Sequence, residues 1–252
     1  MIFSIIKKEM KLYFVTPMAM IIFPAFLALS CFFLYNTLID YLKLTTSPEM
    51  HVSGIKAYEY IFSNLFSKIY FIFSLVIPLL TMRLVAEEKR AHTHELMMSL
   101  PISPLQYILG KYLAALCFSY ILLLLTLICP LILMPFAKVE WGLLLISYLG
   151  LFLYILLYTA VGTYFSTLTS NQFIACIATM GFSLSFMILG WLAYISPVEI
   201  EKILAALLIF NHVSTFYDGY VYLADVTLFI SATFLFLYLA QRKVLIEYPV
   251  NT

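Results

Sequence analysis

The sequence predicts an all-α integral membrane protein with six transmembrane helices. Of its 252 residues, 64% are hydrophobic and 11% are charged, whereas soluble domains carry about 25% charged residues. The mean hydropathy is +1.02. The apolar residues form long blocks with few charges, not the alternating pattern of a membrane β-barrel. We therefore expect residues 1–252 to form a single transmembrane domain.

Each predicted span has about the 20 apolar residues that a helix needs to cross a bilayer. The six spans are residues 17–39, 60–84, 104–134, 141–165, 172–196 and 222–241. The uncharged run 141–198 is too long for one crossing, and the polar residues 166–171 predict a turn inside it. The uncharged run 12–39 is too long for a signal peptide, so we expect the first span to be retained.

Residues 1–16 are predicted to form a basic amphipathic helix that lies on the membrane surface. One face carries Phe3, Ile6, Met10, Tyr13 and Pro17. Another face carries Ser4, Lys7, Lys8 and Lys11. We expect the three lysines to contact an anionic lipid surface, because a basic amphipathic helix binds at the headgroup boundary.

Two helix starts are well marked. Residues 103–106 (Ser-Pro-Leu-Gln) form a capping-box pattern that begins span three, with proline at the first helical position. Residues 196–199 (Ser-Pro-Val-Glu) repeat this design. The second start predicts a short helix at about 197–210, too short to cross the membrane. The segment 197–221 is therefore expected to be an outer helix or a re-entrant segment before span six.

The distribution of basic residues predicts that both termini are cytoplasmic. With the N-terminus inside, nine of the fourteen Lys and Arg residues lie on the cytoplasmic side. The segment 85–101, between spans two and three, is then cytoplasmic. It is a charged segment between two long apolar stretches.

The sequence contains no motif that would make this chain an enzyme. It has no glycine-rich phosphate loop, no nucleophile elbow and no His-Glu-x-x-His motif. His92 and His94 lie beside Glu95, but their spacing places them on opposite sides of a helix, so we expect no metal site. We expect no catalytic residue and no cofactor in this chain. A net charge of +1 gives no indication of nucleic-acid binding.

Lys68 is the clear candidate for a charge inside a predicted span. One interpretation places it in the outer half of span two, with its ammonium group reaching the interface. The other places it in a cavity, where it meets an anionic group of a substrate.

A longer pattern of residues accompanies the six-span topology. It comprises Pro78-Leu79-Leu80-Thr81-Met82-Arg83, Ala86-Glu87-Glu88-Lys89-Arg90, Thr93, Glu95-Leu96, Leu100-Pro101 and Gly110-Lys111. This pattern resembles the permease subunit of type 2 ABC exporters. It looks most like the bacterial permeases of the gliding-motility and nitrous-oxide-reductase maturation type. The sequence departs from the family at His92 and His94, where glycine and an aliphatic residue are more common.

The resemblance implies that residues 85–101 act as a coupling helix that docks on a separate ATPase. The implied contacts are Glu87, Glu88, Lys89, Arg90, Thr93, Glu95, Leu96, Met97 and Met98. Two copies of the ATPase would carry ATP and Mg, and a second copy of this chain, or a similar permease, would complete the transporter. The resemblance also implies a bacterial cytoplasmic membrane and outward transport.

By the same resemblance, spans two and five line the substrate path and the dimer interface, with Lys68, Ser183 and Ser185 as candidate path residues. The sequence does not indicate the substrate. The alternative function is a membrane scaffold that anchors an ATPase and transports nothing. A membrane-embedded enzyme is a third class, and the sequence offers no catalytic constellation for it.

Overall fold

The computed structural model describes residues 2–46, 57–93, 102–133, 140–195 and 208–247. Within these ranges the chain is helical and has no β-strand. Among the described residues, six helical segments are long and apolar enough to cross a membrane. They are α2 (Pro17–Thr46), α3 (Ala57–Thr81), α6 with α7 (Pro104–Leu125 and Ile128–Leu133), α8 (Trp141–Leu168), α9 (Gln172–Ile195) and α12 (Leu223–Glu247). The predicted all-α membrane fold is confirmed.

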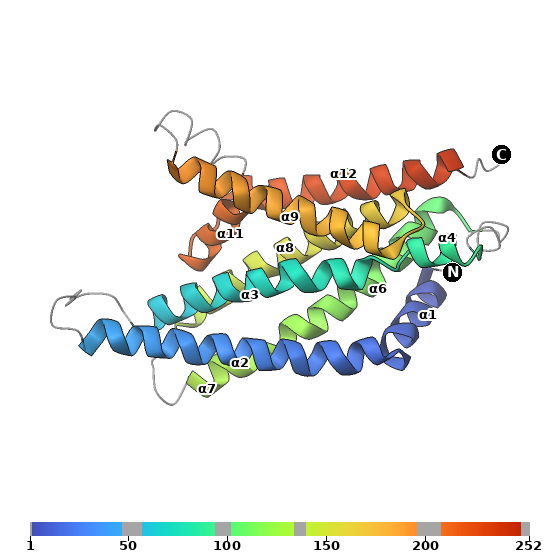
Figure 1. The fold of residues 1–252 in the computed structure, drawn as a ribbon. Coiled ribbons are helices and arrows are strands. Elements are labelled where there is room, and N and C mark those ends of the chain that lie inside the picture. The colour runs from blue at the N-terminus through green and yellow to red at the C-terminus, as the bar shows by residue number, and fades with distance from the viewer. Residues whose placement is uncertain (1, 47–56, 94–101, 134–139, 196–207, 248–252) are drawn as a thin grey trace.

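The two ends of the helical bundle differ in what they carry (Figure 1). One end holds α1 (Ile2–Val15), α4 (Ala86–Arg90) and both ends of the described chain. We call it the α4 end. The opposite end holds α7 and α11 (Ile209–Tyr217), and we call it the α11 end. Helix α8 packs against α3, α6, α9, α11 and α12, so it is the central helix of the bundle.

Local sequence signals account for several helix boundaries. The Ser103 hydroxyl accepts a 3.2 Å hydrogen bond from the Gln106 amide, and Gln106 Oε1 accepts one from the Ser103 amide, so the first predicted capping box is confirmed. A turn also lies in the predicted polar run, but it is confined to 169–171, because α8 continues to Leu168 and α9 begins at Gln172. The second capping box and most of the predicted helix at 197–210 lie outside the described residues.

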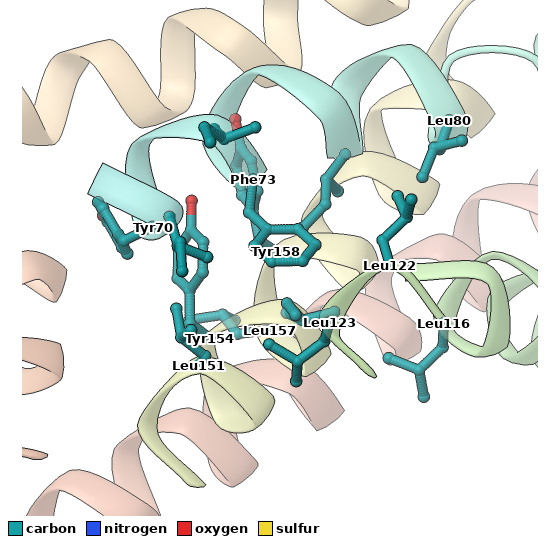
Figure 2. Close-up of a cluster of buried hydrophobic side chains, with 14 of the residues drawn as sticks. Tyr70, Phe73, Leu80, Leu116, Leu122, Leu123, Leu151, Tyr154, Leu157 and Tyr158 are labelled. Atoms are coloured by element: carbon teal, nitrogen blue, oxygen red, sulfur yellow. The ribbon is translucent and has the colours of Figure 1, made fainter. Parts of the chain in front are cut away.

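The core of the bundle forms where α3, α6 and α8 meet (Figure 2). Tyr70 and Phe73 of α3 pack among leucines of α6 and against Tyr154 and Tyr158 of α8. The Tyr158 hydroxyl donates hydrogen bonds to two carbonyl oxygens, that of Ser74 in α3 at 3.1 Å and that of Thr179 in α9 at 3.0 Å. Burial of a tyrosine is favourable when its hydroxyl finds an acceptor. Tyr158 therefore links three helices in the core.

Gly162 of α8 allows α3 and α8 to approach each other closely. A Cβ atom built on Gly162 would lie 2.1 Å from Thr81 Oγ1 and 2.7 Å from Thr81 Cβ. Such distances are far inside van der Waals contact. Only glycine fits at position 162 with the two helices where they are.

A buried carboxylate joins α11 to α12 at the α11 end. Asp225 Oδ1 lies 2.7 Å from His212 Nδ1, and Asp225 Oδ2 accepts a 2.8 Å hydrogen bond from the Thr215 hydroxyl. Asp225 is in the first turn of α12, where the helix dipole favours negative charge. These contacts fix α11 against the start of the last span.

Helix α1 packs one face against the bundle and leaves the other exposed. Its buried residues are Ile5, Glu9 and Tyr13, and it packs mainly against α6, while Phe3 is 79% exposed. Of the predicted apolar face, Tyr13 therefore packs inside the bundle, while Phe3 stays free to contact lipid. Glu9 is buried because it pairs with Lys111 of α6.

Candidate functional site

The candidate site is the α4 segment, which we define as residues 82–93. A serine of α8 caps the start of α4. The Ser166 hydroxyl accepts hydrogen bonds from the amides of Val85 and Ala86, at 3.0 and 3.2 Å, and donates one to the Met82 carbonyl oxygen. Val85, the residue before α4, provides no side-chain cap. Ser166 therefore satisfies amide groups that the first turn of a helix leaves unpaired.

Helix α4 ends in a left-handed turn at His92. The φ angle of His92 is +55°, and His92 is the one non-glycine residue with a positive φ in the described part of the chain. The Thr93 amide donates a 3.0 Å hydrogen bond back to the Glu88 carbonyl oxygen, as in a helix C-terminal cap that normally uses glycine. The chain thus makes the sharp turn without a glycine. A helix capped by Thr93 would lie outside the described residues.

Replacing His92 with glycine is expected to stabilise the end of α4. The left-handed conformation costs a non-glycine residue about 1 kcal/mol, which glycine avoids. Hydrogen exchange of the Ala91 to Thr93 amides should therefore slow by about threefold to fivefold. Ala91→Gly is the matched control, because Ala91 has an ordinary φ of −84° and should exchange faster as glycine. Faster exchange in His92→Gly would contradict the assigned turn.

Four charged side chains, one of them from α4, form a closed ring of ion pairs, which we call the charge ring. It contains Lys8 and Glu9 of α1, Glu88 of α4 and Lys111 of α6. The N–O distances are 3.0 Å for Lys8–Glu88, Lys111–Glu88 and Lys111–Glu9, and 3.9 Å for Lys8–Glu9. Positive and negative groups alternate around the ring, so it has no net charge.

The charge ring is largely withdrawn from solvent. The side chain of Lys111 is 1% exposed, and those of Glu9 and Glu88 are 9% and 12% exposed. Lys111 also donates to the Leu84 carbonyl oxygen, and the Tyr107 hydroxyl donates a 2.6 Å hydrogen bond to Glu88. Charges this deep are stable only when they are paired and hydrogen-bonded.

Lys8 is the ring member most open to solvent, and it still depends on its neighbours. Burial lowers the pKa of Lys8, but the hydrogen bond and negative charge of Glu88, with a contribution from Glu9, outweigh burial and raise the pKa above its ordinary 10.5. Lys8 is therefore protonated throughout the physiological pH range.

A second group of contacts holds the other side of α4. Lys89 Nζ lies 2.5 Å from the Glu247 carboxylate of α12 and donates a 2.6 Å hydrogen bond to the Thr167 carbonyl oxygen of α8. Before α4, the Arg83 guanidinium lies 4.4 Å from the centre of the Tyr13 ring and bonds to Thr16. The α4 segment is thus fastened to α1, α6, α8 and α12 and to the start of α2.

The structure divides the predicted coupling residues into three groups. Glu87, Arg90 and Thr93 are exposed. Glu88 and Lys89 are mostly buried and form ion pairs within the chain. Glu95, Leu96, Met97 and Met98 lie outside the described residues. Contact of any of these residues with an ATPase stays a prediction.

Sequence reasoning missed four of the groups that hold α4: Glu9, Lys111, Ser166 and Glu247. One of the four could have been suspected from the sequence, because Lys111 is a lone charge in the first turns of span three and a charge there needs a partner. Among the predicted lipid-contacting lysines, Lys7 and Lys11 are exposed and Lys8 belongs to the charge ring. Contact of α1 with lipid stays a prediction.

The three candidate path residues lie in different surroundings. Lys68 donates a 2.8 Å hydrogen bond to Thr37 of α2 and lies 3.9 Å from the Asp40 carboxylate, so it links α3 to α2. Ser183 is buried close to the hydroxyls of Tyr154 and Tyr158. Ser185 is on the exposed side of α9. The structure does not bring these residues together in one chain.

Comparison with known proteins identifies the family. No curated protein matches the chain. Residues 65–240 match the family described as "ABC-2 family transporter protein", and this range covers more than two thirds of the chain and includes α4. With its six membrane-spanning helices, the chain therefore belongs to the ABC-2 family of transporter proteins, as the multi-pass membrane component of an ABC transporter.

Proposed function

We propose that this chain is the permease subunit of an ABC exporter, driven by ATP that a separate subunit hydrolyses at its own ATP and Mg site. The α4 segment receives the force. The observation that supports this role is the attachment of residues 82–93 to four helices through buried charges and hydrogen bonds. A short solvated loop needs no such attachment, whereas a segment that must move the bundle does.

The proposed docking surface is the outward side of α4 and the residues that follow it. Glu87 and Arg90 provide exposed charges, with Thr93 beside them. Opposite charges across such an interface fix the register of the partners. Glu95, Leu96, Met97 and Met98 are proposed to extend this surface with an acidic group and apolar contacts. Glu88 and Lys89 hold α4 in place and support the surface from behind.

The transporter is proposed to contain two copies of this chain, or this chain with a similar permease, and two ATPase subunits. Helix α9 supports this arrangement, because its outer side is apolar and includes Gly181, which has no atom within 4 Å of a built Cβ. Helices α3 and α9 would line the path, with Lys68, Ser183 and Ser185 along it. The ATP-driven change would rock the helices between inward-facing and outward-facing states.

The proposed location is a bacterial cytoplasmic membrane with both termini in the cytoplasm. Both ends of the described chain lie at the α4 end, which supports this orientation (Figure 1). The exposed Lys7 and Lys11 would face anionic lipid there. Within the family, the motif from Ala86 to Lys111 supports a likeness to the gliding-motility and nitrous-oxide-reductase maturation permeases.

Reversing two exposed charges tests the docking surface. Glu87→Lys with Arg90→Glu should lower recovery of an ATPase that co-purifies with the tagged chain by about tenfold or more, equivalent to about 1.4 kcal/mol of binding free energy. Glu87→Asp with Arg90→Lys keeps both charges and should retain the ATPase. Equal recovery from both variants would rule out docking through these residues. Failure of the unmodified chain to bind any ATPase with a phosphate loop would overturn the proposed function.

Transport is tested separately from docking. An exporter should hydrolyse ATP faster in lipid when its substrate is present. A complex that stays intact but shows no response to lipids, peptides, drugs, polysaccharides or metal and sulfur species would instead be a scaffold that anchors the ATPase.

A further inference from the structure

We infer that Lys111 is a positioning residue for energy coupling, which joins α1 and α4 into one rigid unit anchored on α6. The inference rests on the proposed function in one respect, namely that α4 receives the force from the ATPase. It adds that α1 moves with α4, because the buried ammonium group of Lys111 contacts both helices, alongside the more exposed Lys8–Glu88 pair.

Two hydrogen bonds and a further ion pair surround the ammonium group of Lys111. A lysine ammonium has three donors. The acceptors around Lys111 are Glu9 of α1, Glu88 of α4 and the carbonyl oxygen of Leu84, which precedes α4. Three acceptors from two segments, α1 and the α4 segment, thus surround the Lys111 ammonium group. Lys111 itself lies in α6, seven residues after that helix begins at Pro104.

The surroundings of the ring make separate motion of α1 and α4 unfavourable. If α4 moved away alone, Glu88 would leave Lys111 and Lys8. If α1 moved away alone, Glu9 would lose Lys111 and Glu88 would lose Lys8. Either motion leaves a buried charge with an incomplete set of partners, in a place where water does not reach it. Movement of α1, α4 and the first turns of α6 together keeps every ion pair of the ring.

Lys111 has a different role from the exposed charges of α4. It is 1% exposed, so it cannot touch a docked ATPase. Its effect on coupling must pass through α1 and α4. Loss of Lys111 should therefore leave docking in place and remove the transmission of movement to α1.

Distances between spin labels in the protein test this inference. Labels are placed on cysteines that replace the exposed Lys7 of α1 and Ala91 after α4, with the four native cysteines changed to alanine. A third labelling position, the exposed Tyr220 at the α11 end, serves as reference. We expect one narrow Lys7–Ala91 distance that is the same without nucleotide and with trapped ATP. A Lys7–Ala91 distance that changes with ATP in the otherwise unmodified chain would overturn the inference.

The variant Glu9→Gln with Lys111→Met removes the buried part of the link without unbalancing the charge, and leaves the more exposed Lys8–Glu88 pair between α1 and α4. We expect its Lys7–Ala91 distances to spread over several values, and the ATP-driven change in the Lys7–Tyr220 distance to disappear while the ATPase still co-purifies. Lys111→Arg, which keeps the charge, should retain the narrow distance. A narrow distance or a full ATP-driven change in the double variant also overturns the inference.

The two proposals fail in different ways. The Lys7–Ala91 distance in the permease alone needs no ATPase. If no ATPase binds the unmodified chain, the proposed function fails, while this distance still decides whether Lys111 joins α1 to α4.

Discussion

Replacing Lys111 with methionine is expected to lower the free energy of unfolding by about 3–5 kcal/mol. Methionine has a similar length and no charge, so the change removes the ammonium group with little loss of packing volume. Glu9 and Glu88 would then share a buried site with only Lys8 between them. The Leu84 carbonyl oxygen would also lose its side-chain donor. Removing one partner from a buried ion pair is costly because the remaining charge is not hydrated.

Thermal unfolding of the purified protein in detergent measures this effect. Lys7→Met is the matched control, because Lys7 lies on the same end of the molecule with an exposed side chain, and it should change stability by less than about 0.5 kcal/mol. Adding Glu9→Gln to Lys111→Met should restore part of the loss, since it removes the unpaired carboxylate. Equal stability of Lys111→Met and Lys7→Met would refute the ring of buried charges.

Replacing Gly162 with alanine is expected to lower the free energy of unfolding by about 2–3 kcal/mol or more. The new Cβ would overlap Thr81 Oγ1 and Cβ, at 2.1 and 2.7 Å. Rotation of the Thr81 side chain cannot remove the overlap, because its Cβ is fixed to the backbone of α3. The two helices must therefore separate, and they would disturb the core drawn in Figure 2.

Gly181→Ala is the control for this prediction. It makes the same chemical change in the middle of α9, where no atom lies within 4 Å of the built Cβ. Alanine favours a helix over glycine by about 1 kcal/mol, so Gly181→Ala should be neutral or stabilising in the isolated chain. The difference between the melting temperatures of Gly162→Ala and Gly181→Ala measures the destabilisation that the overlap with Thr81 causes. A similar shift in both variants would contradict the close contact of α3 and α8.

Hydropathy was sufficient to predict the number and order of the spans. Each span is a long apolar block, and a membrane imposes helical structure on such a block because its amide groups must be paired internally. The ends were harder to predict. Helix α2 continues to Thr46 and α12 to Glu247, beyond the predicted ends at 39 and 241. Polar residues can extend a helix past the bilayer, so hydropathy marks the membrane boundary and not the helix boundary.

The arrangement around α4 could not be predicted in the same way. Glu88 and Lys89 look like solvent-facing charges in a short charged segment, since their partners are distant in sequence. Lys8 lies 80 residues from Glu88, Glu9 lies 102 from Lys111, and Glu247 lies 158 from Lys89. No local pattern connects such pairs. The family resemblance predicted where force could enter, and only the structure showed which charges face inward.

The separation between Glu9 and Lys111 also bears on how the protein is made. Helix α1 leaves the ribosome before α6, and the lysine that pairs with Glu9 follows 102 residues later. At about 5–20 residues per second, the wait is roughly 5–20 seconds. During that time α1 has no docking site on α6, because the first turns of span three do not yet exist. A chain interrupted before position 111 lacks the lysine that pairs with Glu9. Packing of α1 against α6 therefore shows that synthesis has passed the first turns of span three.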